Sequence, residues 1–333
     1  MIALSVTSRC NMRCRHCFAP QFEGEDPRLD EIEVLARNLG TMQGIGLGGG
    51  EAFLRRDLTA IARTFAAVSP NLSICITTNG YSPERIARVS KEILAGCPWA
   101  RLRIVLSLDG LEGTHDDIRQ TRGAFESTMA TARALAPVRS ESPRFSLGFV
   151  ATLCTINYEE LPALARYVRA EFDTSLDYHL LTGEPRDSSL RLPPLDELAR
   201  AMRAIDAANG SPVPIRQQVF TDLRLRTLSE RRQVIPCQAG SVAGVVRADW
   251  EVRLCHSLPS LGNLRHDSFR SIWQSEAARR QRASIRRGEC WCHRDCYIAR
   301  DMGFYWKIPL IERRARMRQA FREHLAAGQP RSH

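Results

Sequence analysis

A chain of 333 residues with 44% hydrophobic side chains is long enough for one large or two moderate domains, each with its own core. No apolar run approaches the ~20 residues of a membrane span, and the N-terminus shows no signal peptide, so we expect a cytoplasmic protein without membrane contact. The 11 cysteines are then expected to bind metal instead of forming disulfides. The net charge of +10 is spread along most of the predicted helices without a nucleic-acid-binding motif, so nucleic acid is not an expected partner.

Short apolar runs alternate with amphipathic stretches from the N-terminus to about residue 190. The candidate strands span 2–6, 44–47, 72–77, 102–108, 145–153 and 176–181. The candidate helices span 30–39, 57–68, 83–95, 124–135, 159–171 and 195–208. This alternation predicts an α/β fold with a parallel sheet, arranged as an open, partial (β/α)6 TIM-like barrel. In such folds the active site lies at the carboxyl ends of the strands, so we expect the catalytic and cofactor-binding residues there.

Three cysteines, Cys10, Cys14 and Cys17, follow the first strand with C-x3-C-x2-C spacing. Three thiolates satisfy three irons of a [4Fe–4S] cube and leave the fourth iron open, as a substrate-binding cluster requires. Zinc prefers four ligands and paired cysteines, although His16 could complete a zinc site. The spacing therefore favours iron over zinc.

With the aromatic Phe18 that follows it, this loop resembles the cluster-binding loop of the radical S-adenosylmethionine (radical SAM) enzymes. The resemblance implies that the open iron is chelated by SAM. It also implies that an electron from the cluster cleaves SAM to methionine and a 5′-deoxyadenosyl radical, which abstracts hydrogen from a substrate. Phe18 is then a candidate for cofactor binding, and the expected electron donor is a low-potential protein of the flavodoxin or ferredoxin type.

The ends of the next three strands extend the resemblance. Gly48-Gly49-Gly50-Glu51 looks like the superfamily's glycine-rich motif that meets the SAM amino group, with a turn that caps the next helix as the structural alternative. Asn79, in an Asn-Gly turn, is a candidate for cofactor binding or for a purely structural role. By similarity, Ser107 and Arg119 would hold the carboxylate and ribose region of SAM, and arginine suits that task through charge-assisted bonds.

Three further residues are candidate catalytic groups, each with a structural alternative. Asp109 is an active-site carboxylate or a turn residue. Cys154 could donate a hydrogen atom near a substrate radical, or it is a small buried hydrophobe. Arg186 could meet substrate or SAM, or form a salt bridge within its loop.

A second group of cysteines occupies the last hundred residues. Its members are Cys237, Cys255, Cys290, Cys292 and Cys296. A predicted hairpin over 242–254 ends at one of them, and a basic helix precedes the last three, a pattern that closes around zinc or an iron–sulfur cluster. Together with the Gly262-Asn263-Leu264 run, this pattern resembles the SPASM/twitch extension of radical SAM enzymes. The resemblance implies an auxiliary [4Fe–4S] cluster, with one of the last three cysteines spare.

We therefore predict four regions: a radical SAM partial barrel over 1–190, a helical connector with one helix over 191–235, a small α+β cluster domain over 236–300, and a basic helix and tail over 301–333. No peptide-recognition domain is expected ahead of the first strand. The predicted function is hydrogen abstraction in the maturation of a ribosomally made peptide or protein. The alternative is oxidation or rearrangement of a small molecule in natural-product or cofactor biosynthesis. A zinc-binding, nucleic-acid-binding protein is a distant alternative that leaves the glycine-rich motif unexplained.

Overall fold

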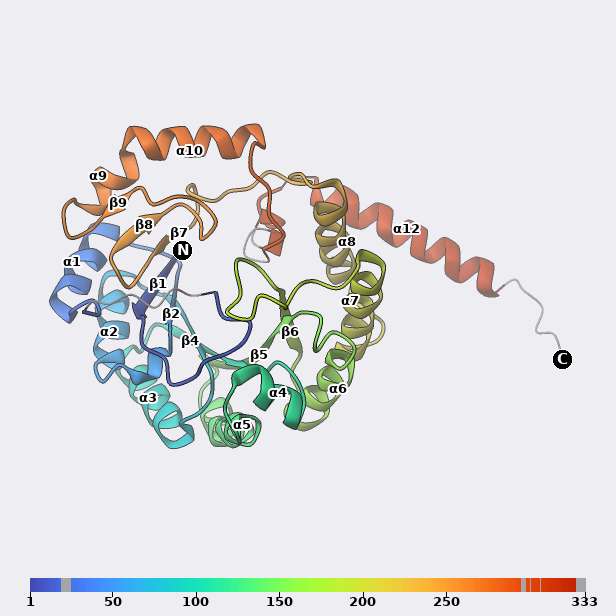
Figure 1. The fold of residues 1–333 in the computed structure, drawn as a ribbon, viewed down its shortest axis with the longest axis horizontal. Helices are drawn as coiled ribbons and strands as arrows, with labels where there is room; N and C mark the ends of the chain where they lie inside the picture. The colour runs from blue at the N-terminus through green and yellow to red at the C-terminus, as the bar shows by residue number, and fades with distance from the viewer. Residues whose placement is uncertain (19–24, 295–297, 300, 306, 328–333) are drawn as a thin grey trace.

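The computed structural model describes residues 1–333 except 19–24, 295–297, 300, 306 and 328–333. One curved sheet forms its centre, with strand order β6-β5-β4-β3-β2-β1-β7-β8-β9 (Figure 1). The six parallel strands are β1 Ile2–Thr7, β2 Gly44–Gly49, β3 Ser73–Thr78, β4 Arg101–Ser107, β5 Phe145–Leu153 and β6 Leu176–Leu180. Because β1 and β6 lie at opposite ends of this part of the sheet, the barrel is open, and the predicted partial (β/α)6 architecture is confirmed.

Helices cover the outer face of the parallel strands. They are α1 Leu29–Leu39, α2 Leu58–Val68, α3 Pro83–Gly96, α5 Ala124–Glu141 and α6 Leu161–Phe172. Each of α1, α2, α3 and α6 turns an apolar stripe inward; α1, for example, buries Ile32, Leu35 and Ala36 at helical spacing. Strand residues such as Ile104 and Phe149 are fully buried between these helices and the barrel interior.

Two short elements at the site escaped prediction. The 3₁₀-helix η1 Ala52–Leu54 follows β2, and α4 Glu112–Arg119 follows β4. The sequence of α4 carries one large aliphatic residue, Ile118, while its other buried side chains are His115 and Arg119. A helix that buries polar groups has no apolar period to detect, which is why the pattern misses it.

The C-terminal cysteine region continues the barrel sheet. Strand β7 Gly244–Val246 runs parallel to β1, with Ile2 opposite Gly244 and Leu4 opposite Val246. Strands β8 Glu251–Arg253 and β9 Gly262–Asn263 then add on in antiparallel fashion. Helices α9 Phe269–Gln274 and α10 Glu276–Arg287 lie above this edge (Figure 1). The predicted hairpin is thus present, and it is hydrogen-bonded to the first strand of the chain.

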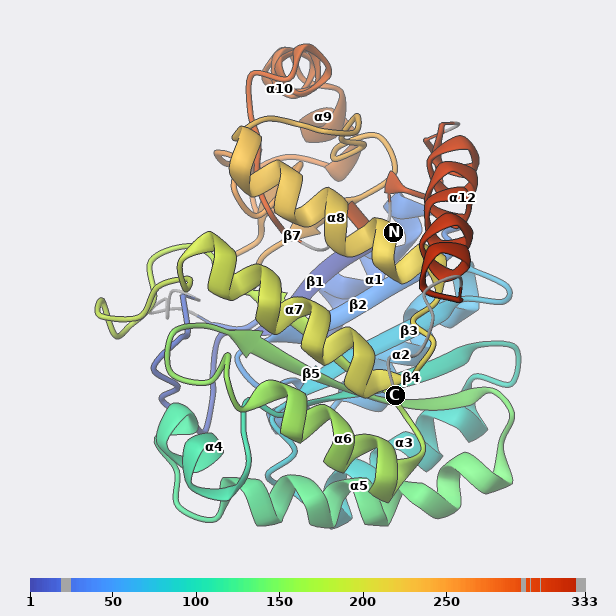
Figure 2. The same ribbon diagram turned by 90° about the vertical axis from the view of Figure 1, so that its right-hand side faces the viewer.

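The expectation of a single helix between residues 191 and 235 is wrong, because α8 Ile215–Glu230 follows α7 Leu195–Asn209. Helix α7 lies beside α6, and α8 lies beside α7 on the side away from α6 (Figure 2). The buried face of α8 includes Arg224, whose guanidinium lies 4.6 Å from the ring centre of Tyr178. Because this charged residue lies on the buried face, the sequence of α8 shows no continuous apolar stripe, and its pattern did not predict a helix.

The last helix, α12 Ile308–Ala327, begins against α8 and then runs outward from the body (Figure 1). Ile308 packs with Val219 and Leu223 of α8, and Glu312 pairs with Arg216 at 3.1 Å. Among the described helices, none is both long and apolar enough to cross a membrane.

Candidate active site and auxiliary cysteine cluster

The first three cysteines lie on the loop that leaves β1 at the carboxyl edge of the sheet. Cys14 is buried, while Cys10 and Cys17 are half-buried, and all three pack around Met12. Burial raises the pKa of Cys10 and of Cys14, so each would remain a thiol without a metal to stabilise the thiolate.

Within the described part of the chain, no three side chains of Cys, His, Asp or Glu lie close enough together to hold a single metal ion. Each thiolate of a [4Fe–4S] cube binds a different iron, so the thiolates of a cluster need not meet at one point. A structural zinc site, in contrast, needs its four ligands around one ion. Cys10, Cys14 and Cys17 lie together around Met12 on one loop, and three thiolates are a donor set that fits three irons of such a cube.

Neighbouring loops hold the cysteine loop in place. The Arg15 amide donates to the Ile118 carbonyl of α4 at 2.8 Å, and the Arg186 amide donates to the Cys17 carbonyl at 3.0 Å. The Arg186 guanidinium also donates to the Cys14 carbonyl at 3.2 Å. Arg186 therefore shapes the cysteine loop from the far side of the barrel, and a catalytic role for it stays a prediction.

The glycine-rich stretch packs its backbone against the same loop. A side chain at Gly49, where φ is +121°, would place its Cβ 2.0 Å from the Thr7 carbonyl oxygen, and one at Gly50 would come within 2.1 Å of the Arg9 carbonyl oxygen. Only glycine permits this approach. At Gly48, in contrast, a Cβ would meet no atom within 4 Å. Gly49 and Gly50 are thus required by backbone packing, while Gly48 faces open space.

The Glu51 carboxylate is buried directly behind this stretch. It accepts hydrogen bonds from the Phe53 amide at 3.0 Å, the Thr78 hydroxyl at 2.8 Å and the Asn79 amide at 2.8 Å. Burial raises the pKa of Glu51, and these three donors partly offset that effect. The Asn79 side chain donates in turn to Asn11 of the cysteine loop at 2.7 Å. Glu51 and Asn79 therefore tie the ends of β2 and β3 to that loop.

A buried ion pair adjoins the cysteines on the other side. The Arg119 guanidinium lies 2.6 Å from the Asp109 carboxylate and 3.7 Å from the Cys14 sulfur. Burial alone would raise the pKa of Asp109, but the Arg119 charge and neighbouring histidines outweigh it and hold that pKa below its usual value. Asp109 also accepts from the Thr152 amide at 2.7 Å. Ser107, the half-buried last residue of β4, lies two positions before this carboxylate.

Two histidines complete the polar environment of Asp109. His115 is fully buried, and its Nδ1 accepts from the Asp109 amide at 3.0 Å, so the remaining proton is on Nε2. Burial, followed by the Arg119 charge, lowers the pKa of His115 to about 4. His16 lies 3.8 Å from the Asp109 carboxylate, and burial lowers its pKa as well. Both rings are therefore neutral at pH 7.

Replacing His115 by asparagine is expected to make the protein less sensitive to acid. The pKa of His115 is about 4 when folded, against roughly 6.5 unfolded. Between these values the unfolded chain binds the proton and the folded chain does not, so the wild-type free energy of unfolding falls as pH drops below 6.5. This group contributes about 2 kcal/mol of that loss at pH 5 and none above pH 7.

Asparagine keeps an acceptor for the Asp109 amide but does not titrate. Urea unfolding of His115→Asn and wild type at pH 7 and pH 5 measures the difference. Identical pH dependence in the two proteins would show that His115 is not held neutral.

Cys154 lies in different surroundings from the metal-binding candidates. Its side chain is fully buried and packs with Leu181 and Leu190. Burial raises the pKa of this thiol to about 11. These apolar surroundings are typical of a structural cysteine. The protonated thiol is also the form that can donate a hydrogen atom, so the proposed catalytic role of Cys154 stays a prediction.

The C-terminal cysteines gather below α10. Cys237, Cys255, Cys290 and Cys292 are half-buried, whereas Cys296 lies outside the described residues. Cys237, Cys255 and Cys290 share one apolar cluster with Ile285 of α10, and Cys292 joins Cys237 in a second cluster. Burial raises the pKa of Cys237 to about 12. The amide two residues after Cys237 donates to its sulfur at 3.5 Å, and the amide two residues after Cys255 does the same. Such bonds stabilise cluster thiolates and tune their potential.

Gln233 is a positioning residue that the sequence did not reveal. Its side-chain amide donates to the carbonyls of Cys290 and Ile285 at 2.8 and 3.0 Å and lies 3.8 Å from the Cys290 sulfur. Its side-chain oxygen accepts from the Cys237 amide at 3.2 Å. Gln233 thus joins two cysteines that are 53 residues apart in sequence, and no local pattern marks it.

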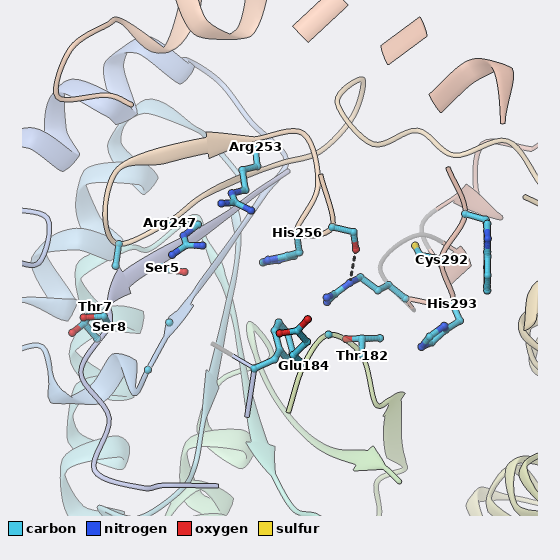
Figure 3. A pocket seen from close by; sticks show the side chains of 18 residues that line it. Ser5, Thr7, Ser8, Thr182, Glu184, Arg247, Arg253, His256, Cys292 and His293 are labelled. Carbon is cyan, nitrogen blue, oxygen red and sulfur yellow. Dashed lines mark hydrogen bonds between the residues drawn. The ribbon is translucent and has the colours of Figure 1, made fainter. Parts of the chain in front are cut away.

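A cavity of about 760 Å³ separates the barrel from the cysteine-rich region (Figure 3). Its walls include Thr7, Phe18 and Gly49 from the barrel and Arg247, His256 and Cys292 from the C-terminal region. Burial, followed by three nearby arginines, lowers the pKa of His256 to about 4. The Leu181 carbonyl contacts the ring of His293 at 3.0 Å and so links β6 to the segment that holds Cys292.

Comparison with known families agrees with this geometry. The family model of the radical SAM superfamily matches residues 4–168, and that of an iron–sulfur cluster-binding domain, SPASM, matches residues 237–297. The chain belongs to the radical SAM superfamily of enzymes and carries a SPASM domain. These two domains imply [4Fe–4S] clusters and S-adenosylmethionine as cofactors.

Individual relatives differ in how much of the chain they match. Pre-heme d1 synthase of Dinoroseobacter shibae is 28% identical over 233 residues, which cover 65% of this chain but 53% of that protein. The chain therefore spans about half the length of this relative. AdoMet-dependent heme synthase of Methanosarcina barkeri is 25% identical over 307 residues, covering 83% of this chain and 82% of the relative.

Among solved structures, Streptococcus suis SuiB has a similar fold. Bound to its precursor peptide SuiA, it superimposes with a TM-score of 0.62 at 14% identity, over 86% of this chain and 66% of SuiB. Bound to S-adenosylmethionine, it gives a TM-score of 0.63 at the same identity, over 85% of this chain and 67% of SuiB. Likeness at this identity concerns the fold alone.

Proposed function

We propose that the protein reductively cleaves S-adenosylmethionine at the Cys10–Cys17 loop and uses the resulting 5′-deoxyadenosyl radical to abstract hydrogen from a substrate in the cavity. One observation carries this proposal. Phe18 and Gly49, which adjoin the cysteine loop, and Cys292 of the SPASM domain line the same cavity (Figure 3). A substrate there would lie between the cysteine loop of the barrel and the cysteines of the SPASM domain.

The chain's own residues have distinct tasks in this proposal. Cys10, Cys14 and Cys17 hold the SAM-binding cluster and leave one iron for SAM. The Arg119 guanidinium keeps a positive charge beside the Cys14 sulfur, and its buried Nε has no hydrogen-bond partner among the described residues. That N–H is available to a carboxylate of bound SAM. Glu51 and Asn79 hold the glycine-rich stretch against the cysteine loop.

The four described SPASM cysteines, Cys237, Cys255, Cys290 and Cys292, are proposed ligands of an auxiliary cluster. Four thiolates complete one cube, so this cluster would pass electrons to or from the substrate radical without an open iron. Gln233 would fix the spacing between Cys237 and Cys290. A flavodoxin or ferredoxin is the proposed electron donor.

For the substrate we propose a peptide or protein that the enzyme modifies. The similarity of fold to SuiB bound to its precursor peptide supports this choice. The second candidate is a small molecule. The relation to AdoMet-dependent heme synthase over most of both chains supports it, as does a cavity whose volume is typical of small-molecule sites.

Anaerobic purification followed by iron, sulfide and zinc analysis tests the proposal first. About eight irons per chain and a brown colour are expected for two [4Fe–4S] clusters. Reduced protein should then convert SAM to 5′-deoxyadenosine. Zinc without iron uptake on reconstitution, or an iron-loaded protein that leaves SAM intact, would contradict the proposed activity.

A further inference from the structure

The cavity between the barrel and the SPASM domain is lined by three arginines. Arg247, Arg253 and Arg294 all line it, whereas Glu184 is its one acidic lining residue in the described part of the chain. Arg247 and Arg253 come from the β7–β8 hairpin, and Figure 3 shows both side chains directed toward the space above Glu184. Superfamily membership does not require this charge, because the clusters and SAM are assigned to other residues.

The two hairpin arginines are held from behind by carboxylates that do not line the cavity. Arg253 donates through Nε and Nη2 to Glu251, at 3.0 and 2.6 Å, and through Nη1 to the Leu258 carbonyl at 3.3 Å. Arg247 Nη2 lies 2.9 Å from the Asp249 carboxylate. Arg247 and Arg253 keep 24% and 22% of their side chains exposed. These ion pairs fix the guanidinium planes in advance, so less side-chain entropy is lost when a ligand binds.

Arg294 carries the least compensated charge on this wall. Its Nε donates to the Ser257 hydroxyl at 3.0 Å, and its guanidinium lies 5.0 Å from the ring centre of Phe18. Among the described residues, no carboxylate is paired with it. A guanidinium held by a neutral hydroxyl and an aromatic ring keeps N–H donors for an anion.

We propose that Arg247, Arg253 and Arg294 form a subsite that binds an anionic group of the substrate, a carboxylate or a phosphate. This inference rests on the proposed function and names the substrate class: a molecule that carries negative charge on the side facing the SPASM hairpin. Forked guanidinium groups recognise both anions in a bidentate manner. Because the Arg294 guanidinium lies 5.0 Å from the Phe18 ring centre, the anchored end would lie beside Phe18, and the rest of the substrate would extend toward the cysteine loop.

Binding of simple anions to the cluster-loaded protein tests the subsite. Dissociation constants for citrate, for inorganic pyrophosphate and for the peptide Gly-Asp-Asp-Gly are measured anaerobically by calorimetry, first without SAM and then with saturating SAM. Wild type is expected to bind at least one of them. Arg294→Gln and Arg247→Gln should weaken that binding at least tenfold, or about 1.4 kcal/mol. The preferred probe indicates whether the anion is a small-molecule carboxylate, a phosphate or an acidic peptide side chain.

The matched control is Arg280→Gln, which removes the same charge from an exposed position on α10, where Arg280 pairs with Glu276. Equal weakening by this control would show that net charge alone attracts the anion and would overturn the subsite. Loss of citrate binding when SAM is added would assign the arginines to SAM and overturn it as well. So would a wild type that binds none of the probes.

The test of the subsite can be separated from loss of the auxiliary cluster and from failure of the proposed function. Arg294 adjoins Cys292 and could disturb the auxiliary cluster, so Arg247→Gln, on the hairpin, provides the comparison if the iron content of Arg294→Gln falls. Failure of the proposed function would appear separately, as a wild type that forms no 5′-deoxyadenosine. Failure of the subsite would appear as Arg247→Gln and Arg280→Gln proteins with the same dissociation constants.

Discussion

Replacing Cys14 by alanine is expected to abolish formation of 5′-deoxyadenosine from SAM. Cys14 is the most buried of the three loop cysteines, and its sulfur lies beside Arg119. Two thiolates would not retain a cluster that has one open iron. The rate of 5′-deoxyadenosine formation should therefore fall by more than the roughly 10–100-fold that is typical when a residue hydrogen-bonded to a metal ligand is replaced. Chromatography of the reaction products measures this rate, and iron analysis measures the cluster content. We expect about four irons per chain to remain, bound to the SPASM domain.

Cys75→Ala is the matched control, because Cys75 is a half-buried free cysteine within β3, away from both cysteine groups. It should keep the full iron content and full SAM cleavage. Undiminished 5′-deoxyadenosine formation by Cys14→Ala would remove the basis for assigning the cluster to this loop.

The second large effect is expected at the buried pair of Asp109 and Arg119. Asparagine at position 109 keeps an acceptor for the Thr152 amide but leaves the Arg119 charge uncompensated. Breaking a buried ion pair in this way costs about 3–5 kcal/mol of stability. Arg119 would also lose the contact that orients it beside Cys14, so SAM binding should weaken. Urea unfolding and SAM titration measure the two effects.

The double variant Asp109→Asn, Arg119→Met separates stability from function. Without a buried charge to compensate, it should recover most of the lost free energy of unfolding. It should not recover SAM binding, because the guanidinium itself is absent. Full SAM affinity in the double variant would show that Arg119 serves the fold only, and an unchanged stability of Asp109→Asn would show that the pair is not formed.

The barrel was predictable because its signals are local. Each strand from β1 to β6 is a short apolar run, and β1, β2, β3 and β5 are followed by the amphipathic helices α1, α2, α3 and α6, so that both periods can be read within about 15 residues. The three loop cysteines share this property, since their ligand spacing lies within eight consecutive positions.

The elements that sequence reasoning missed depend on contacts between distant residues. The sequence of α8 lacks a continuous apolar period because Arg224 lies on its buried face, where it packs over Tyr178, a residue 46 positions earlier. The pairing of Asp109 with Arg119 requires the turn of α4, a helix without an apolar period. Gln233 has a recognisable role only once Cys237 and Cys290 are brought together. In each case a polar side chain is held by a partner that is distant in sequence or lies across a turn, and no local pattern predicts that contact.

The pairing of β7 with β1 also has a consequence for synthesis of the chain. Strand β1 emerges first, but one of its two edges stays unpaired until Val246 has left the ribosome. At roughly 5–20 residues per second, this interval lasts on the order of 10–50 s. An apolar strand with a free edge invites pairing with other nascent chains, so yield in cells should depend on chaperones and slow expression.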